Sequence, residues 1–439
     1  MTKERKKMYI SQCIIAKNEE DNIGHCLSHI KSVVDEQIVV DTGSTDRTVE
    51  IAEKLGAKVF NFDWVDDFSA ARNFALDKAR GDWIIFLDCD EYFSEQSIPL
   101  IRNTIRKISG NRNINGILTE LINIDKNKNI ISSIKNVSPR IFRNRKSLRY
   151  KNKIHELLVD AKSKEANSAV VCLDATNDIK IFHTGYDKSI MDDKKKNERN
   201  INLLKEELKN NPTDANLLLY ISKSLYTDEQ YEESLEYALK ALRNMDDDKN
   251  LDYYPVIYST ILHTMYVLGY GKDDMQAMFD EAVSKYPEHP DYYRAIGLAL
   301  IRSGDIKEAI EFLEKCVLYC NNYRSNIESF ALGQIEKVYS ELLGAYIIDD
   351  NRPKIVEISA ALLNADKYDY ENLSVLIKTL LTQEKEEAVI QFLSKIYDYR
   401  NFKDKIYLLK SSEVSENEKL INYYKSLMNE EELRAYKNI

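Results

Sequence analysis

GDWIIFLDCDEYF, residues 81–93, places a run of large apolar residues directly before a group of acidic ones. Such an uninterrupted apolar run is typical of a strand that is buried on both faces. Three carboxylates, Asp88, Asp90 and Glu91, follow where that strand should end. In sheets of parallel strands, ligands bind beyond the carboxyl ends of the strands. The segment therefore predicts a central strand with a binding site at its tip.

Strand-like and helix-like segments alternate in the chain before this stretch. The predicted strands are residues 9–16, 36–42, 57–62 and 83–88, and the predicted helices are residues 22–34, 45–56 and 69–81. This alternation predicts βαβ units with right-handed connections, and hence an α/β fold with a Rossmann-like, mostly parallel sheet. From about residue 115 the strand-like segments become shorter, and from about residue 190 a helical period continues to the end.

The helical half contains a repeat. Residues 216–242 and 291–317 align with each other, and a degenerate copy lies between them. The period of about 34 residues is typical of tetratricopeptide (TPR) helix pairs, which stack to bury a continuous core. The predicted divisions of the chain are a catalytic domain at 1–190, a connecting helix at 191–212, TPR-like repeats at 213–345 and a helical cap or dimerisation region at 346–439.

The composition excludes several classes of protein. The net charge is −10 and the sequence pI is about 5.4, so we expect no nucleic-acid partner, which would need a positive surface. No stretch approaches the 18 apolar residues of a transmembrane helix. The six cysteines are scattered without a CxxC pair, which favours a reduced, cytoplasmic protein.

Asp88 and Asp90 are candidate metal ligands. If the strand continued through them, their side chains would lie on one side, about 6.5 Å apart along the chain. Two such carboxylates repel each other, and a divalent cation such as Mg²⁺ or Mn²⁺ would relieve that repulsion. The alternatives are that these acids begin a solvated loop, or that they form the paired carboxylates of a hydrolase, which usually come from separate elements.

The motifs of the first half, residues 13–30, 38–52 and 63–91, resemble in order and spacing those of family-2 glycosyltransferases with the GT-A fold. The resemblance implies that Asp88-Cys89-Asp90 is the Asp-x-Asp motif, which holds Mg²⁺ or Mn²⁺ against the diphosphate of a nucleotide sugar. It also implies nucleotide-sugar contacts by Ala16, Asn18, Glu19, Asp41 and Arg72, with Asp41 on the base and Arg72 near the diphosphate. A turn role for Asp41 and a surface position for Arg72 are the structural alternatives.

Two later segments, residues 150–158 and 181–189, resemble elements of bacterial family-2 enzymes that carry a helical repeat domain, the layout of sublancin-type peptide S-glycosyltransferases. The resemblance implies that Glu156 is the base that activates the acceptor, with His155 as the alternate. It also implies that His183 completes the metal shell or contacts a phosphate. Both histidines could instead be polar packing residues.

The expected activity is an inverting, metal-dependent transfer of N-acetylglucosamine or glucose from a UDP-sugar, as the resemblance implies. Stacked helical repeats suit extended peptides, which favours a protein or peptide acceptor, a flagellin-like protein through Ser/Thr or a bacteriocin precursor through Cys. An envelope polysaccharide or lipopolysaccharide acceptor is the alternative, with the basic residues 3–7 as its one candidate membrane-facing segment. A non-catalytic TPR scaffold is the alternative of another class.

Overall fold

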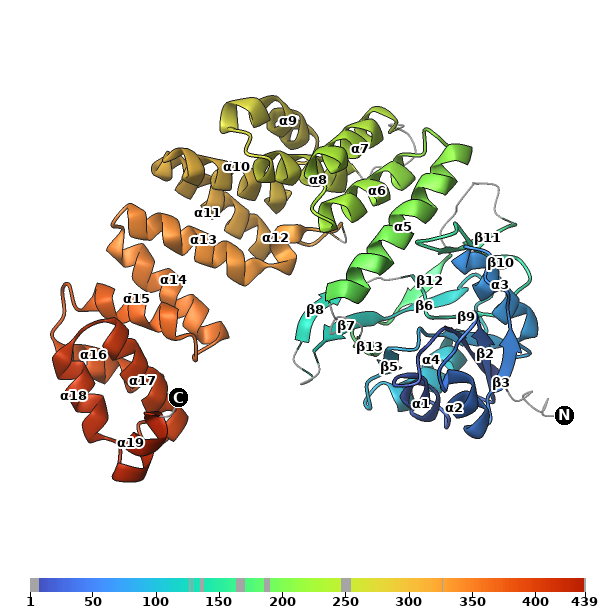
Figure 1. The fold of residues 1–439 in the computed structure, drawn as a ribbon, viewed down its shortest axis with the longest axis horizontal. Coiled ribbons are helices and arrows are strands. Elements are labelled where there is room, and N and C mark those ends of the chain that lie inside the picture. The colour runs from blue at the N-terminus through green and yellow to red at the C-terminus, as the bar shows by residue number, and fades with distance from the viewer. Residues whose placement is uncertain are drawn as a thin grey trace. The chain divides into compact units, whose positions relative to one another are not determined.

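The computed structural model describes residues 8–125, 128, 130–134, 138–162, 170–184, 190–245, 254–325 and 327–437 (Figure 1). The basic residues 3–7 lie outside these ranges. The chain divides into two compact units, Met1–Asn244 and Met245–Ile439. The predicted divisions at 190, 212 and 345 stay predictions.

The first unit is built on a seven-stranded mixed sheet with the strand order β12-β6-β9-β4-β1-β2-β3. These strands are β1 (Ile10–Ala16), β2 (Glu36–Asp41), β3 (Lys58–Asn61), β4 (Trp83–Phe86), β6 (Gly116–Leu118), β9 (Ile141–Arg143) and β12 (Cys172–Asp174). β1 pairs in parallel with β2 and β4, and β2 pairs in parallel with β3, whereas β9 runs antiparallel to β4 and β6. The predicted α/β class with a mostly parallel sheet is confirmed.

Helices connect these strands as the alternation predicts. They are α1 (Ile23–Ser28), α2 (Thr48–Lys54) and α3 (Phe68–Lys78). A further helix, α4 (Ile98–Ile108), was not among the predicted ones. The start of α3 is fixed by Asp67, whose side chain accepts a hydrogen bond from the backbone N–H of Ala70 at 2.8 Å. This cap sets where α3 begins and therefore where Arg72, on its second turn, is presented.

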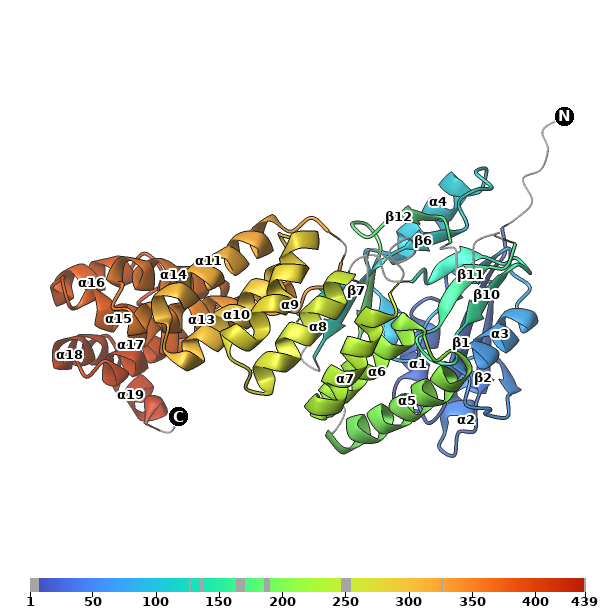
Figure 2. The same cartoon turned by 90° about the horizontal axis from the view of Figure 1, so that it is seen from above.

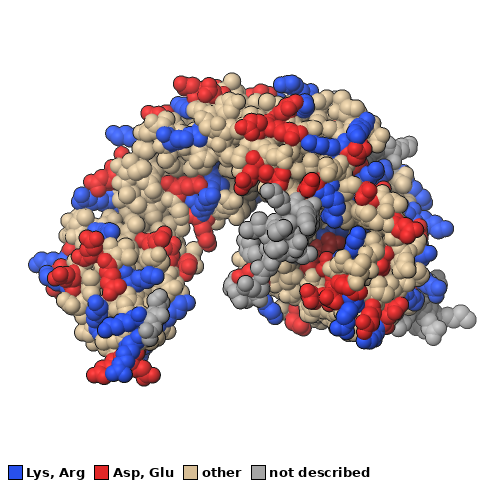
Figure 3. Space-filling view, viewed as in Figure 1, with Lys and Arg blue, Asp and Glu red and all other residues tan. Residues whose placement is uncertain are grey.

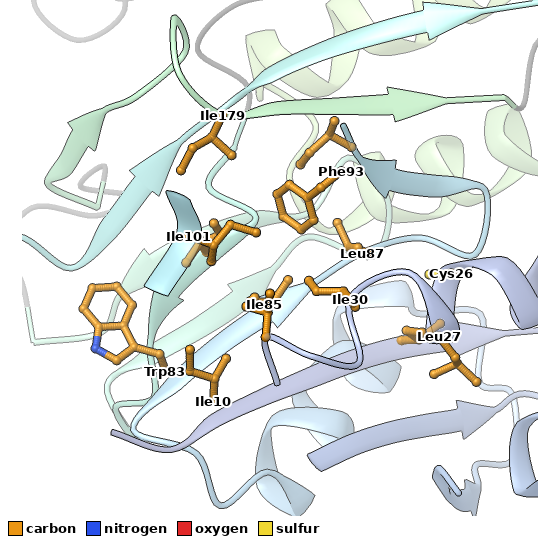
Figure 4. Close-up of a cluster of buried hydrophobic side chains, with 14 of the residues drawn as sticks. Ile10, Cys26, Leu27, Ile30, Trp83, Ile85, Leu87, Phe93, Ile101 and Ile179 are labelled. Carbon is orange, nitrogen blue, oxygen red and sulfur yellow. The ribbon is translucent and has the colours of Figure 1, made fainter. Parts of the chain in front are cut away.

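β4 lies in the middle of the sheet with both of its faces covered. Trp83 and Ile85 belong to a core cluster that includes Ile101 of α4, whereas Ile84 and Phe86 belong to a second cluster on the other face. Figure 4 shows the first cluster, with side chains from β1, β4 and α4 directed toward one another. Burial on both faces explains why the strand reads as a continuous apolar run.

Two smaller sheets complete the strands of this unit. One has the order β5-β13-β7-β8, and the other is the antiparallel pair β10-β11. The strands are β5 (Glu91–Phe93), β7 (Glu120–Ile124), β8 (Ile130–Ile134), β10 (Leu148–Lys151), β11 (Leu157–Asp160) and β13 (Lys180–His183). The pairing of β5 with β13 brings Glu91 opposite His183, which places His183 beside the acidic turn although the two are far apart in sequence.

Three helices follow within the same unit, namely α5 (Ile190–Asn210), α6 (Ala215–Thr227) and α7 (Tyr231–Arg243), and they lie side by side (Figure 2). α6 and α7 are joined as a hairpin by reciprocal hydrogen bonds: the hydroxyl of Ser222 donates to the carbonyl of Ser234, and that of Ser234 to the carbonyl of Ser222, both at 2.8 Å.

The second unit is helical throughout its described residues. Its helices are α8 (Tyr254–Val267), α9 (Lys272–Lys285), α10 (Pro290–Ser303), α11 (Ile306–Asn322), α12 (Phe330–Gly333), α13 (Ile335–Ile348), α14 (Arg352–Ala365), α15 (Tyr370–Leu380), α16 (Glu386–Leu393), α17 (Phe402–Val414), α18 (Glu418–Ser426) and α19 (Glu430–Tyr436). The pair α10–α11 coincides with the repeat at 291–317, and the TPR-like helical region is confirmed. Self-association through 346–439 stays a prediction.

Acidic and basic side chains are intermixed on the face shown in Figure 3. Among the described residues, no helix is long and apolar enough to cross a bilayer.

Candidate active site

Asp88 and Asp90 lie in a tight turn between β4 and β5, and Glu91 is the first residue of β5. β4 ends at Phe86, and the backbone N–H of Glu91 donates to the carbonyl of Asp88 at 3.1 Å. The strand geometry expected for Asp88 and Asp90 is therefore wrong, because the chain reverses between them. The Cys89 side chain is buried and packs in the first core cluster, so the thiol leaves the acidic side of the turn free.

Arg72 joins two carboxylates. Its Nη2 donates to Oδ1 of Asp88 at 2.8 Å, and its Nε donates to Oε1 of Glu156 at 3.1 Å. The side chain is only 8% exposed, and its guanidinium lies over the rings of Phe86 and Tyr150. Arg72 is therefore not the surface arginine of the structural alternative.

One donor of Arg72 remains unused. Nη1 is buried and has no hydrogen-bond partner among the described residues. A buried guanidinium N–H without a partner is costly, so it marks a position where an anionic oxygen would be bound favourably.

Arg140 is a site residue that the sequence reading missed. Its Nη2 and Nε donate to the two oxygens of Glu91 at 2.6 and 3.0 Å, and Nη2 lies 3.4 Å from Oδ2 of Asp88. Glu91 is 2% exposed and accepts from the backbone N–H of Asp88, so it supports the turn. The sequence signal for this residue was an arginine directly before the apolar residues of β9, since an arginine buried there needs an acidic partner.

These arginines control the charge of Asp88. Burial alone would raise the pKa of its carboxyl, but the positive charges of Arg72 and then Arg140 outweigh burial and lower the pKa to about 2. Asp88 is thus ionised at neutral pH, as a metal ligand must be.

Asp90 faces His183. Oδ2 of Asp90 lies 3.3 Å from Nε2 of His183, and Nδ1 of His183 lies 2.8 Å from Oδ1 of Asn123. Since a carbonyl oxygen only accepts, Nδ1 carries the hydrogen and Nε2 is the atom presented to Asp90. Burial would lower the pKa of His183, but the hydrogen bond and charge of Asp90 outweigh it, and the net pKa is raised.

The donor set fits a divalent cation in its chemistry. Asp90 and His183 offer one oxygen and one nitrogen in contact, and a carbonyl holds the far ring nitrogen of His183, as is usual for metal-bound histidines. Asp88 is directed to the two arginines, and within the described ranges no three His, Cys, Asp or Glu side chains converge as a ready metal cage. Such an open set suits Mg²⁺ or Mn²⁺, which take further ligands from phosphates and water.

His155 and Glu156 lie in the loop between β10 and β11. Glu156 reaches Arg72, whereas the ring of His155 stacks on Tyr220 of α6, with ring centroids 4.1 Å apart. Burial lowers the pKa of His155, more than the neighbouring charge of Glu156 raises it. The structure therefore brings Glu156 together with Arg72 and Asp88, and directs the ring of His155 toward the helices.

The residues expected around the nucleoside lie at the ends of β1 and β2, where Ala16 and Asp41 are paired neighbours. Asp41 accepts from the backbone N–H groups of Gly43 and Ser44, both at 3.2 Å, which is the turn role of the structural alternative. A part in base recognition stays a prediction for Asp41.

Asn18 and Glu19 form the loop beyond Ala16. Asn18 has a left-handed backbone (φ 55°) and accepts from the backbone N–H of Thr45, while Glu19 accepts from the side-chain amide of Asn22 at 2.8 Å. The bond between Asn18 and Thr45 ties the β1 loop to the β2 loop, and nucleotide contacts by Asn18 and Glu19 stay predictions.

Residues 11–157 match the family model described as Glycosyl transferase family 2. A TPR repeat-containing protein of Synechococcus elongatus is 28% identical over 66% of this chain and 68% of its own length. The SPbeta prophage-derived glycosyltransferase SunS of Bacillus subtilis is 27% identical over 64% of this chain and 65% of its own length. The match thus spans about two thirds of each of these relatives.

Other matches are shorter or more distant. An uncharacterized glycosyltransferase of Rickettsia felis is 45% identical over 87 residues, which is 20% of this chain and 30% of that protein. Glucosyl-3-phosphoglycerate synthase of Mycobacterium tuberculosis, solved with Mn²⁺, UDP and glucosyl-3-phosphoglycerate, is 25% identical over 27% of this chain and 44% of that chain, with a TM-score of 0.22. S. aureus TarS is 15% identical over 58% of this chain and 52% of that chain, with a TM-score of 0.33.

Proposed function

We propose that the chain is a metal-dependent, inverting glycosyltransferase with a UDP-sugar donor, a proposal supported by the match of residues 11–157 to the model of glycosyl transferase family 2. The single observation that carries the proposal is the position of Arg72, which touches both Asp88 and Glu156 at the end of β4. The guanidinium of Arg72 thereby connects Asp88, the carboxylate proposed to serve donor binding, with Glu156, the proposed acceptor base.

The donor half of the site would be held by charge. Asp88, Asp90 and His183 are the proposed holders of Mg²⁺ or Mn²⁺, which when bound neutralises the diphosphate and stabilises the departing UDP. The unused Nη1 of Arg72 is the proposed donor to a diphosphate oxygen. The loops of Asn18 and Asp41 are the proposed surroundings of the nucleoside, with Ala16 and Glu19 beside them.

The acceptor half would be served by Glu156. The acceptor oxygen or sulfur forms a bond to the anomeric carbon while the bond from that carbon to the diphosphate oxygen breaks. Glu156 takes the acceptor proton, and UDP leaves with the bonding electron pair. Because Glu156 accepts from Nε of Arg72, a shift of Arg72 toward the diphosphate would free Glu156 when the donor is bound. His155 is the alternate base, since its lowered pKa keeps the ring neutral at physiological pH.

The proposed acceptor is a protein or peptide, because stacked helix pairs such as α10–α11 make surfaces that suit extended chains. N-acetylglucosamine and glucose are the proposed sugars. All six cysteines are free, which supports the cytoplasmic location that we propose.

The donor half can be tested without the acceptor. We would measure release of UDP from UDP-glucose and from UDP-N-acetylglucosamine with water as the acceptor, with and without Mn²⁺, and UDP binding by calorimetry. Asp90→Asn should lower both metal-dependent signals at least about tenfold, since it removes a charged ligand. Asp77→Asn is the matched control, because Asp77 is an exposed carboxylate of α3 that pairs with Arg149.

Each outcome bears on the proposal. Absence of Mn²⁺-dependent UDP binding in the wild-type protein would favour a non-catalytic scaffold. Equal effects of the two substitutions would refute the role of Asp90. For the acceptor, intact-mass analysis of coexpressed neighbouring gene products should find a hexose or N-acetylhexosamine increment on a peptide, whereas label in lipid extracts alone would indicate an envelope acceptor.

A further inference from the structure

The loop between β10 and β11, residues 152–156, is held on one side by α3. The backbone N–H of Phe68 donates to the carbonyl of Lys153 at 2.9 Å, and the hydroxyl of Ser69 donates to the carbonyl of Asn152 at 2.6 Å. The helix that carries Arg72 therefore also fixes the start of the loop that carries Glu156.

The other side of this loop is held by α5 and α6. The backbone N–H of Lys153 donates to Oε2 of Glu207 at 3.1 Å, and the ring of His155 stacks on Tyr220 at an interplanar angle of 14°. Ile154 is buried in a cluster with apolar residues of both helices, including Leu204 and Ile221. These helices therefore contact three successive residues of the loop, ending next to Glu156.

The loop needs this support because its backbone is strained. Asn152 and His155 both have left-handed backbones, with φ values of 72° and 53°. A side chain with a Cβ disfavours this conformation, although Asn and His adopt it more often than most residues, so contacts around the loop help to hold it. Asn152 itself accepts the hydrogen bond from Ser69 of α3, and His155 itself stacks on Tyr220 of α6, so the helices hold both of these residues directly.

We propose that α5 and α6 belong to the acceptor half of the active site, with Tyr220 and Glu207 as positioning residues for Glu156. Stacking on Tyr220 fixes His155, and the left-handed turn at His155 then directs Glu156 back to Arg72. This inference rests on the proposed function, in which Glu156 takes the acceptor proton.

The test compares Tyr220→Leu, which keeps apolar volume but loses the ring, with Tyr220→Phe, which keeps the stacking. With Mn²⁺ and UDP-glucose or UDP-N-acetylglucosamine, Tyr220→Leu should lower kcat for UDP release about 10- to 100-fold, because small displacements of a catalytic group have effects of this size. KM and UDP affinity should change much less than kcat, since Tyr220 affects Arg72 only through Glu156. Tyr220→Phe should behave like the wild type.

Two further variants provide a control and a second test of the loop contacts. Tyr226→Ala is the matched control in the same helix, because the ring of Tyr226 packs against Tyr231, and it should leave kcat unchanged. Glu207→Ala removes the hydrogen bond to Lys153 and keeps the stack of His155 on Tyr220. This variant should also lower kcat, and it replaces Tyr220→Leu as the test if that variant is too unstable to assay.

A measurement that does not depend on turnover separates the positioning role of Tyr220 from the proposed function. The ring-proton NMR signals of His155, assigned by their loss in His155→Gln, should move in Tyr220→Leu and stay in Tyr220→Phe. A wild-type protein that neither binds UDP nor releases it would refute the proposed function, whatever these signals do. A protein with activity, in which Tyr220→Leu and Glu207→Ala both keep the wild-type kcat, would overturn the positioning role alone, as would equal losses of kcat and UDP affinity.

Discussion

Arg72 and Glu156 are 84 residues apart in the sequence, yet Nε of Arg72 donates to Oε1 of Glu156 at 3.1 Å. The same guanidinium binds Asp88 at 2.8 Å, so one side chain connects the tip of β4 with the loop between β10 and β11. Because Asp88 and Glu156 share the guanidinium of Arg72, the strength of each ion pair depends on what else Arg72 binds. This shared partner is the physical link between the donor and acceptor halves of the proposed site.

Replacement of Arg72 by lysine should weaken the site although the charge is kept. An ammonium group cannot reproduce the planar fork that reaches Asp88 and Glu156 together. Loss of one hydrogen bond between charged groups is worth about 1.5–3 kcal/mol, so the dissociation constant of UDP should rise roughly tenfold to a hundredfold in Arg72→Lys. Calorimetric titration of UDP in the presence of Mn²⁺ measures this change.

The matched control is Arg149→Lys. Arg149 also pairs with a carboxylate, Asp77 at 2.9 Å, but their side chains are 29% and 62% exposed. An exposed pair contributes little, so UDP binding should be unchanged in this variant. Similar UDP affinities for the two lysine variants would mean that the fork of Arg72 has no part in donor binding.

Arg140 should matter for stability because it neutralises a buried acid. Arg140→Met leaves Glu91, which is 2% exposed, without its charged partner. Removal of one member of a buried pair costs about 3–5 kcal/mol, and this loss should be measurable by urea unfolding. The double variant Arg140→Met/Glu91→Gln should recover a large part of it, since a neutral amide can still accept from the N–H of Asp88. A double variant as unstable as the single one would contradict this account.

The sequence was sufficient to predict the parallel strands β1 to β4, but not the antiparallel part of the sheet or all helix lengths. β4 was predictable because burial on both faces leaves a continuous apolar run from Trp83. The helix predicted over 22–34 ends at Ser28, although Ile30 and Val33 are still buried. The spacing of apolar residues over 22–34 indicates which side chains are buried. Consecutive turns after Ser28 bury Ile30 and Val33 as a continued helix would.

The site was predictable where motifs carry it and not where the fold creates it. The grouping of Asp88, Arg72 and Glu156 followed from their motifs, but the Glu91–Arg140 pair joins residues 49 apart and depends on how β9 meets β4. The strain at His155 was equally invisible, because nothing in the letters around it marks a left-handed backbone. Both features arise from tertiary packing.

Alanine substitutions at two helical glycines of the second unit, Gly297 and Gly344, should have opposite effects on stability. A Cβ at Gly297 of α10 would lie 2.9 Å from Cγ of the fully buried Leu313. Gly297→Ala should therefore destabilise the protein, because overpacking costs about 1–3 kcal/mol and exceeds the helix-propensity gain of about 1 kcal/mol. Thermal and urea unfolding measure the difference.

Gly344 of α13 provides the comparison, since a Cβ there meets no atom within 4 Å. Gly344→Ala should be stabilising by about 0.5–1 kcal/mol through the lower entropy of the unfolded chain. If Gly297→Ala were as stabilising as Gly344→Ala, the tight packing of α10 on α11 would be disproved.

Glu36 of β2 should make the first unit sensitive to acid. Its side chain is 3% exposed and accepts from the Ser11 hydroxyl at 2.7 Å, from Nζ of Lys58 at 2.9 Å and from the backbone N–H of Arg80 at 2.7 Å. Burial would raise the pKa of Glu36, but these donors together outweigh burial and lower it below the ordinary 4.5. The folded state therefore binds this proton less readily than the unfolded state does.

A lowered pKa in the folded state means that Glu36 stabilises the protein above pH 4.5 and that this contribution is lost as the pH falls through the folded-state pKa. Glu36→Gln should thus be less stable than the wild type at pH 7, by about 1–3 kcal/mol, and the two curves should converge toward lower pH. Urea unfolding at a series of pH values gives both curves. Glu53→Gln, at an exposed position of α2, should follow the wild type throughout. A constant gap between Glu36→Gln and the wild type down to low pH would show that the charge of Glu36 is not what its buried partners stabilise.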